Sequence, residues 1–139
     1  MDVYPMRLLP GTEIKSYLQA FVERNKLQAA FILTCCGSVT KARLRFASDQ
    51  HLDHKTVTVD EKMEITSLVG TICKDGAHLH TTLGNQNGQT VSGHVVGDFI
   101  VHTTAEIVLG NAVGYDFSRK FDENTGFAEL VVESKKTDE

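Results

Sequence analysis

The sequence is poor in the residues that build disulfide-rich or membrane-spanning proteins. Its 139 residues include three cysteines, two prolines and no tryptophan. An odd number of cysteines, two of them adjacent at Cys35 and Cys36, argues against a disulfide framework and favours a reducing compartment such as the cytoplasm. No apolar run approaches the roughly 18 residues of a transmembrane helix. The opening MDVYPMRLLPG lacks the basic and apolar regions of a secretory leader, so we expect neither a membrane span nor export.

The chain also lacks an excess of positive charge. It has 14 Lys and Arg residues against 18 Asp and Glu residues, a formal net charge of −4. Because non-specific affinity for nucleic acids comes from clustered Lys and Arg, this balance argues against a protein whose whole surface binds phosphate groups. The best local basic cluster is KARLR, where Lys41, Arg43 and Arg45 alternate with apolar residues. On a strand this alternation is typical of a solvated face opposite a buried one.

The apolar residues follow first a helical and then a strand-like period. A stripe at three- and four-residue spacing predicts a helix over 13–26, with Thr12 as its N-cap. Seven or eight strands are predicted by shorter runs: VYPMRLL, AAFILTCCG, VTKARLRFA, KTVTVD, MEITSLVGTIC, the histidine segment, FIVHTTAEIVLG and FAELVVES. The cysteines lie in such runs and are expected to be buried. The fold class is therefore α+β, a mostly antiparallel sheet packed with one main helix. We expect a single domain over 1–139, with a frayed tail at 134–139.

Three of the six histidines lie close together in the segment 75–98, DGAHLHTTLGNQNGQTVSGHVVGD. His78 and His80 are two residues apart, so on a strand they share one face, with Cα atoms roughly 6.5 to 7 Å apart. Imidazole nitrogens bind zinc at about 2.0–2.1 Å, and two rings at this spacing can converge on one ion. Whether His94 joins them depends on the hairpin between the two strands.

Two registers of this hairpin are open. If residues 86–88 form a three-residue loop with Gly88 in the left-handed conformation, His80 faces His94 directly and all three rings cluster. A two-residue turn at Asn87 and Gly88 would instead point His94 away from the pair, unless the glycine that precedes His94 supplies a bulge.

The three-histidine pattern favours a metal site over three unrelated hydrogen-bonding side chains. We expect zinc, or another divalent metal that accepts nitrogen ligands, at His78, His80 and His94. A vacant fourth position would be the catalytic arrangement, in which a bound water is acidified or a substrate oxygen is polarised. A fourth protein ligand would make the site structural instead.

Other polar residues in or beside the strands are weaker candidates for a functional role. Glu64 and Glu106 interrupt apolar strands and are the candidates for a general base or for a group that orients a metal ligand. A surface position explains each of them equally well. His51 and His54 lie in a polar segment that is typical of a loop, and His102 is expected to pack or to form a hydrogen bond in a strand.

Several motifs together resemble a known family. MEITSLVGTI, the histidine segment and TAEIVLG, in this order, resemble the core of the plant and prokaryote conserved (PPC) domain, also called domain of unknown function 296. RLLPGTEIKSYLQAFVERNKLQAAFILTCCGSV resembles its N-terminal half, so the resemblance covers about 4–133. It implies an α+β domain that assembles as a homotrimer and, in prokaryotic-type members, a metal site that transfers to His78, His80 and His94. Plant members add an AT-hook that binds the minor groove of A·T-rich DNA, and this sequence contains no such segment.

Two hypotheses of different classes follow. The first is a trimeric metal-binding domain that binds a small molecule or acts on it, as a hydrolase or lyase would. The second is a non-enzymatic assembly or regulatory module that binds protein partners or DNA. Without an AT-hook and with a net negative charge, DNA is the least favoured of these partners.

Overall fold

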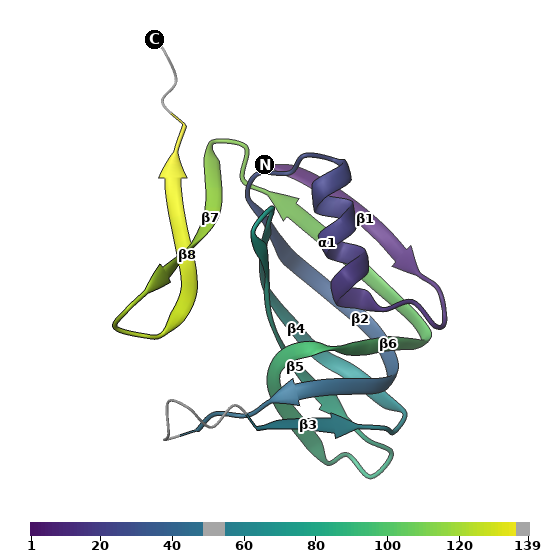
Figure 1. Cartoon of the computed structure of the whole chain (residues 1–139). Helices are drawn as coiled ribbons and strands as arrows, with labels where there is room; N and C mark the ends of the chain where they lie inside the picture. Colours follow the sequence, from purple (N-terminus) through teal and green to yellow (C-terminus); the bar gives the residue numbers. More distant parts are fainter. Residues whose placement is uncertain (49–54, 136–139) are drawn as a thin grey trace.

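The computed structural model describes residues 1–48 and 55–135, and within them it contains one helix and eight strands (Figure 1). His51 and His54 lie outside the described residues. The elements follow the order β1 (Asp2–Leu8), α1 (Ile14–Arg24), β2 (Ala30–Arg45), β3 (Thr56–Val59), β4 (Met63–Cys73), β5 (Gly76–Gly84), β6 (Thr90–Asn111), β7 (Tyr115–Asp122) and β8 (Phe127–Ser134). The strand pairings are antiparallel. The predicted α+β class is therefore confirmed.

Six strands form one sheet in the order β1-β6-β5-β4-β2-β3. β6 also pairs with β2, from Asn111 opposite Ala30 to His94 opposite Arg45, so β2, β4, β5 and β6 form a closed ring. The sequence predicts separate strands within β2 and within β6, and this division is wrong. β2 continues through Gly37 and β6 through Asp98, a residue with φ of 50°. Strands can bend at such irregularities without ending.

Helix α1 packs its apolar stripe on the core of the sheet. Ile14, Leu18 and Val22 are fully or almost fully buried there. Glu13, and not the predicted Thr12, is the N-cap: its carboxylate accepts a hydrogen bond from the Ser16 N–H (2.6 Å) and another from the Phe99 N–H (3.0 Å). The Glu13 side chain is long enough to reach both α1 and β6, which explains why Glu13 and not Thr12 caps the helix. No helix in the described ranges is both long and apolar enough to cross a bilayer.

The cysteines differ in exposure, contrary to the expectation that all three are buried. All are free thiols: Cys73 is buried, Cys35 is half-buried and Cys36 is exposed. Burial, followed by the neighbouring Cys36, raises the pKa of Cys35 to about 12. Cys36 is exposed because it lies opposite Glu106 on the outer face of the sheet, where successive strand residues alternate between core and surface.

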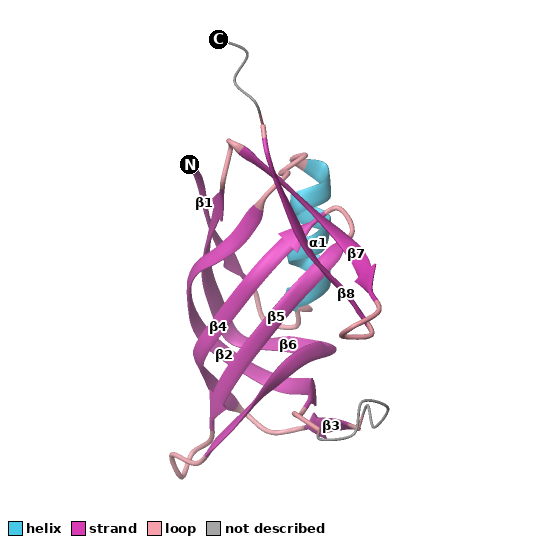
Figure 2. Cartoon of the chain, turned by 90° about the vertical axis from the view of Figure 1, so that its left-hand side faces the viewer, coloured by secondary structure: helices cyan, strands magenta, loops and turns pink. Residues whose placement is uncertain are grey.

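The hairpin of β7 and β8 lies over the outer side of β5 (Figure 2). Two backbone N–H groups of β7 attach it to connections next to the sheet: Phe117 donates to the carbonyl of Gln28, just before β2 (3.0 Å), and Arg119 donates to the carboxylate of Asp75, in the turn between β4 and β5 (3.2 Å). No strand was predicted from the sequence at the position of β7. The predicted tail includes residues 134 and 135, but Ser134 pairs with Tyr115 and the Lys135 N–H donates to the Gly114 carbonyl. Residues 136–139 lie outside the described residues.

Gly93 is required where the end of β2 passes close to β6. A Cβ atom added at Gly93 would lie 2.8 Å from the Arg45 carbonyl oxygen and 3.3 Å from Leu44. We expect Gly93→Ala to lower the free energy of unfolding by about 1–3 kcal/mol, because backbone and packed side chains must move apart. Urea unfolding measures this loss. Gly84→Ala on the same hairpin is the control, since its Cβ would meet only the Thr66 methyl at 3.5 Å; equal stability of the two variants would contradict the packing argument.

Candidate metal centre

The hairpin between β5 and β6 has the register that clusters the histidines. His80 is directly opposite His94, and the pairing continues without a shift to Gly84 opposite Thr90. In the turn, the Gly88 N–H donates to the Asn85 carbonyl (2.9 Å) and Gly88 has φ of 73°. The three-residue loop with a left-handed Gly88 is thereby confirmed, and the two-residue turn is wrong. Gly93 allows a close approach of β2 and forms no bulge between β5 and β6.

The three imidazoles converge on one point outside the sheet. Their ring centroids are 5.0 Å apart for His78 and His80, 5.1 Å for His78 and His94, and 5.5 Å for His80 and His94. The Nε2 atoms of His78 and His80 are 3.1 Å apart. One nitrogen from each ring lies within 4.8 Å of the other two. Nitrogens bound to one tetrahedral zinc at about 2.05 Å are separated by roughly 3.3 Å, so small side-chain rotations would bring all three to one ion.

The environment favours the neutral imidazoles that metals bind. Burial, followed by the charge of Arg45, lowers the pKa of His94 to about 4. Burial and then His80 lower the pKa of His78. The Nδ1 atom of His94 is buried and has no hydrogen-bond partner within the described ranges. Leaving a buried polar nitrogen unpaired is costly, and coordination of this ring would offset such a cost. The residues present therefore fit a metal.

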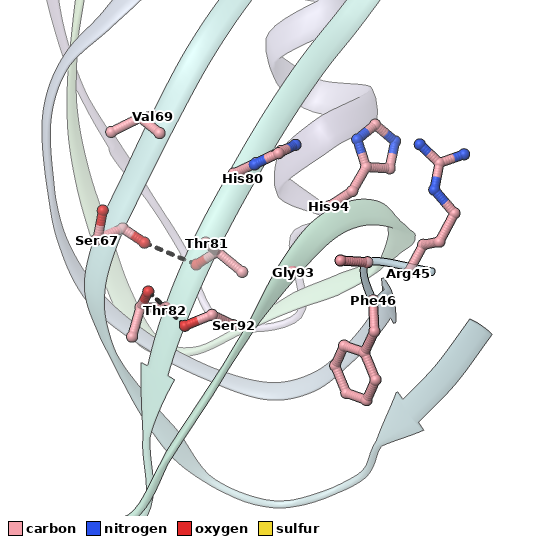
Figure 3. Close-up of a pocket in the computed structure, with 11 residues that line it drawn as sticks. Arg45, Phe46, Ser67, Val69, His80, Thr81, Thr82, Ser92, Gly93 and His94 are labelled. Atoms are coloured by element: carbon pink, nitrogen blue, oxygen red, sulfur yellow. Dashed lines mark hydrogen bonds between the residues drawn. The ribbon is translucent and has the colours of Figure 1, made fainter. Parts of the chain in front are cut away.

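Two cavities flank the histidines, each of about 450 Å³. Both are lined by His80, His94 and Arg45. The first continues along β4, β5 and β6 past a row of hydroxyl side chains, in which the Thr82 and Ser92 hydroxyls are 2.7 Å apart (Figure 3). The second lies beside His78, under the hairpin of β7 and β8. A small molecule could therefore reach the histidines from either side.

The remaining predicted polar residues do not join the cluster. Glu64 is exposed on β4 opposite Gly84, and Glu106 is exposed on β6 between Arg7 and Cys36. Neither lines the two cavities beside the histidines. His102 is a half-buried residue of β6 outside the histidine group. The structure thus gives no support to Glu64 or Glu106 as a general base.

Sequence reasoning missed three residues that line this site. Arg45 is part of KARLR, whose predicted alternation is confirmed because Ala42 and Leu44 are fully buried, but its position in the lining of both cavities was not predicted. Arg119 and Phe127 come from β7 and β8. The alternation of Tyr115, Phe117, Arg119 and Phe121 is a signal that could have revealed β7.

Comparison with known proteins identifies the family. Residues 1–113 match the Plants and Prokaryotes Conserved (PCC) domain, the family whose motifs the sequence resembles. The chain therefore belongs to this family. The strands β7 and β8 lie beyond the matched residues.

Individual relatives share most of this chain. It is 44% identical over 133 residues to the bifunctional protein GlmU of Synechococcus sp., which covers 96% of this chain but only 21% of GlmU. The chain thus spans about a fifth of that relative's length. A Salmonella enterica protein of known structure is 37% identical with a TM-score of 0.89, over 97% of this chain and 95% of that one. The metal-containing protein AF0104 of Archaeoglobus fulgidus is 25% identical with a TM-score of 0.81, over 94% of each chain.

Proposed function

We propose that this protein is a trimeric metal-binding protein whose centre, His78, His80 and His94, holds a zinc ion and binds a small molecule. The observation that carries the proposal is the convergence of three imidazole nitrogens within 4.8 Å of one another. The description of AF0104, a relative of similar fold, as a metal-containing protein also supports it.

The ligand set supports a centre that leaves room for an exogenous ligand. The group contains three histidines and no cysteine or carboxylate among the described residues. Structural zinc sites have four protein ligands, whereas three ligands and an open position are typical of catalytic sites. Bound there, zinc supplies a Lewis acid that can acidify water or polarise a substrate oxygen. The two adjoining cavities, each of about 450 Å³, give a small molecule room beside the centre.

The trimeric state is proposed from the family resemblance and from the surface of the chain. β1 is an edge strand of seven residues that pairs only with β6 among the described strands. Val3 and Leu33 are 50% and 43% exposed, and Cys36 is exposed as well. An unpaired edge and exposed apolar side chains next to it form a surface that other subunits can cover. DNA is not part of the proposal, because the net charge of −4 opposes contact with phosphates.

Titration of metal-free protein with Co²⁺ tests the metal centre, since Co²⁺ replaces zinc and has a visible spectrum. We expect one equivalent per protomer and absorption typical of a four-coordinate ion with nitrogen ligands. A spectrum identical to that of hydrated Co²⁺ at all ratios would refute the proposal.

A further inference from the structure

Arg45 is placed beside the metal centre by the pairing of the strands. It lies directly opposite His94 in the pairing of β2 with β6, so both side chains project from the same face of the sheet. Figure 3 shows the guanidinium group next to the His94 imidazole. Arg45 is also half-buried and lines both cavities that flank the histidines. The guanidinium is therefore part of the lining of the site.

The guanidinium of Arg45 contacts an aromatic ring of the β7–β8 hairpin. Its Cζ atom lies 4.9 Å from the centroid of the Phe127 ring, a cation-π contact with the β7–β8 hairpin. In the part of the chain that the structure describes, it has no hydrogen-bond or ion-pair partner. Aromatic stacking occupies a face of the guanidinium and leaves the N–H groups at its edge for a ligand.

A second guanidinium lies on the opposite side of the histidines. Arg119 donates from Nη2 to the Thr71 hydroxyl (2.7 Å), and Thr71 is directly opposite His78 in the pairing of β4 with β5. The cavity beside His78, which Arg119 lines, also contains two carboxylates. That of Asp75 accepts the Arg119 backbone N–H, and the other belongs to Glu129. The carboxylates balance the two arginines, so a divalent ion at the histidines would leave the site with a net positive charge.

This arrangement weakens the binding of a metal cation by itself, and an anion bound beside the cation would strengthen that binding. A fixed positive charge next to His94 repels a metal cation at that residue. Among the described residues Arg45 forms no direct ion pair with a carboxylate, so its charge weakens the bare centre. An anion bound to both the metal and Arg45 would turn this repulsion into attraction. Arginine suits that role because its planar fork donates two parallel hydrogen bonds to a carboxylate or a phosphate.

We propose that the centre binds a small anionic molecule, with a carboxylate or phosphate group held by Arg45 while an oxygen of the molecule faces the histidines. Arg119 contributes the second positive charge on the side of His78. The inference rests on the proposed metal centre and names the class of molecule that it binds.

The test measures anion binding to Co²⁺-loaded protein by calorimetry and by the visible spectrum, with malonate and inorganic phosphate as probes. At least one probe is expected to bind and to change the spectrum. Arg45→Gln is expected to weaken that binding about 10-fold or more, because a charge-assisted pair of hydrogen bonds is lost. Arg45→Lys keeps the charge without the fork and should lie between the two. Arg7→Gln, which removes an exposed arginine of β1 outside both cavities, should bind as the unchanged protein does.

The outcomes separate the two proposals. Preference for malonate or for phosphate identifies the anionic group, and either result supports the inference. Normal Co²⁺ loading with no binding of either probe, or with equal binding by Arg45→Gln, would overturn the inference alone. Failure to load Co²⁺ would overturn the metal centre, and the anion site with it.

Discussion

Replacing His80 with alanine is expected to weaken zinc binding by about 100-fold or more. His80 contacts both other members of the group: its Nε2 atom is 3.1 Å from the Nε2 atom of His78, and it is directly opposite His94 in the strand pairing. Changes to residues that merely orient a metal ligand typically cost 10–100-fold in affinity, so the loss of a ligand should cost at least as much. Competition with a chromophoric chelator measures the affinity of metal-free protein for Zn²⁺.

The matched control is His102→Ala. His102 is a half-buried histidine of β6, yet it lies outside the histidine group, so its replacement should leave zinc affinity unchanged. Circular dichroism of both variants verifies that they are folded. Equal affinities for His80→Ala and the unchanged protein would show that zinc, if bound, is bound elsewhere.

Sedimentation equilibrium is expected to give a mass about three times the 15.3 kDa of one chain. The physical reason is the outer face of β1, β2 and β6, which exposes Val3, Leu33 and Cys36 next to the open edge of β1. Burial of apolar surface yields roughly 25 cal/mol per Å², so covering this face with further copies of the chain would stabilise an assembly.

A charge on this face should weaken the trimer. Leu33→Asp places a carboxylate on an exposed apolar position of β2, and desolvation of an unpaired charge would oppose association. Val113→Asp is the control, since Val113 has a similar exposure (48%) but lies between β6 and β7. A monomeric mass for the unchanged chain at micromolar concentration would refute the trimer.

Local patterns predicted the elements that decide the candidate site. The spacing of His78 and His80 fixes their common face, because side chains alternate along a strand. The Asn-Gly signal at 87–88 permitted two registers, which differ only in how the loop is closed. The structure selects the one with a left-handed Gly88, where Asn85 also accepts two backbone hydrogen bonds from the loop. The choice between the two registers depends on the hydrogen bonds of the whole turn, and the Asn-Gly pair alone does not determine it.

Features that depend on distant parts of the chain could not be predicted in this way. Arg45 and His94 are 49 positions apart in the sequence and become neighbours only because β2 and β6 pair and close the ring. The contact of Arg45 with Phe127 requires the β7–β8 hairpin to lie over the sheet. The exposure of Cys36 likewise follows from its position opposite Glu106 on the outer face. An apolar run indicates a strand, but it does not show which face is buried when the sheet curves.

The metal content of the protein as purified tests the central claim most directly. The protein is prepared without a metal-affinity tag and analysed by inductively coupled plasma mass spectrometry. The account predicts close to one zinc, or one other divalent transition metal, per protomer, and a protein stripped by chelator should regain one equivalent of Zn²⁺. An empty protein that takes up no added metal would contradict it, and His78, His80 and His94 would then be a cluster of hydrogen-bonding side chains.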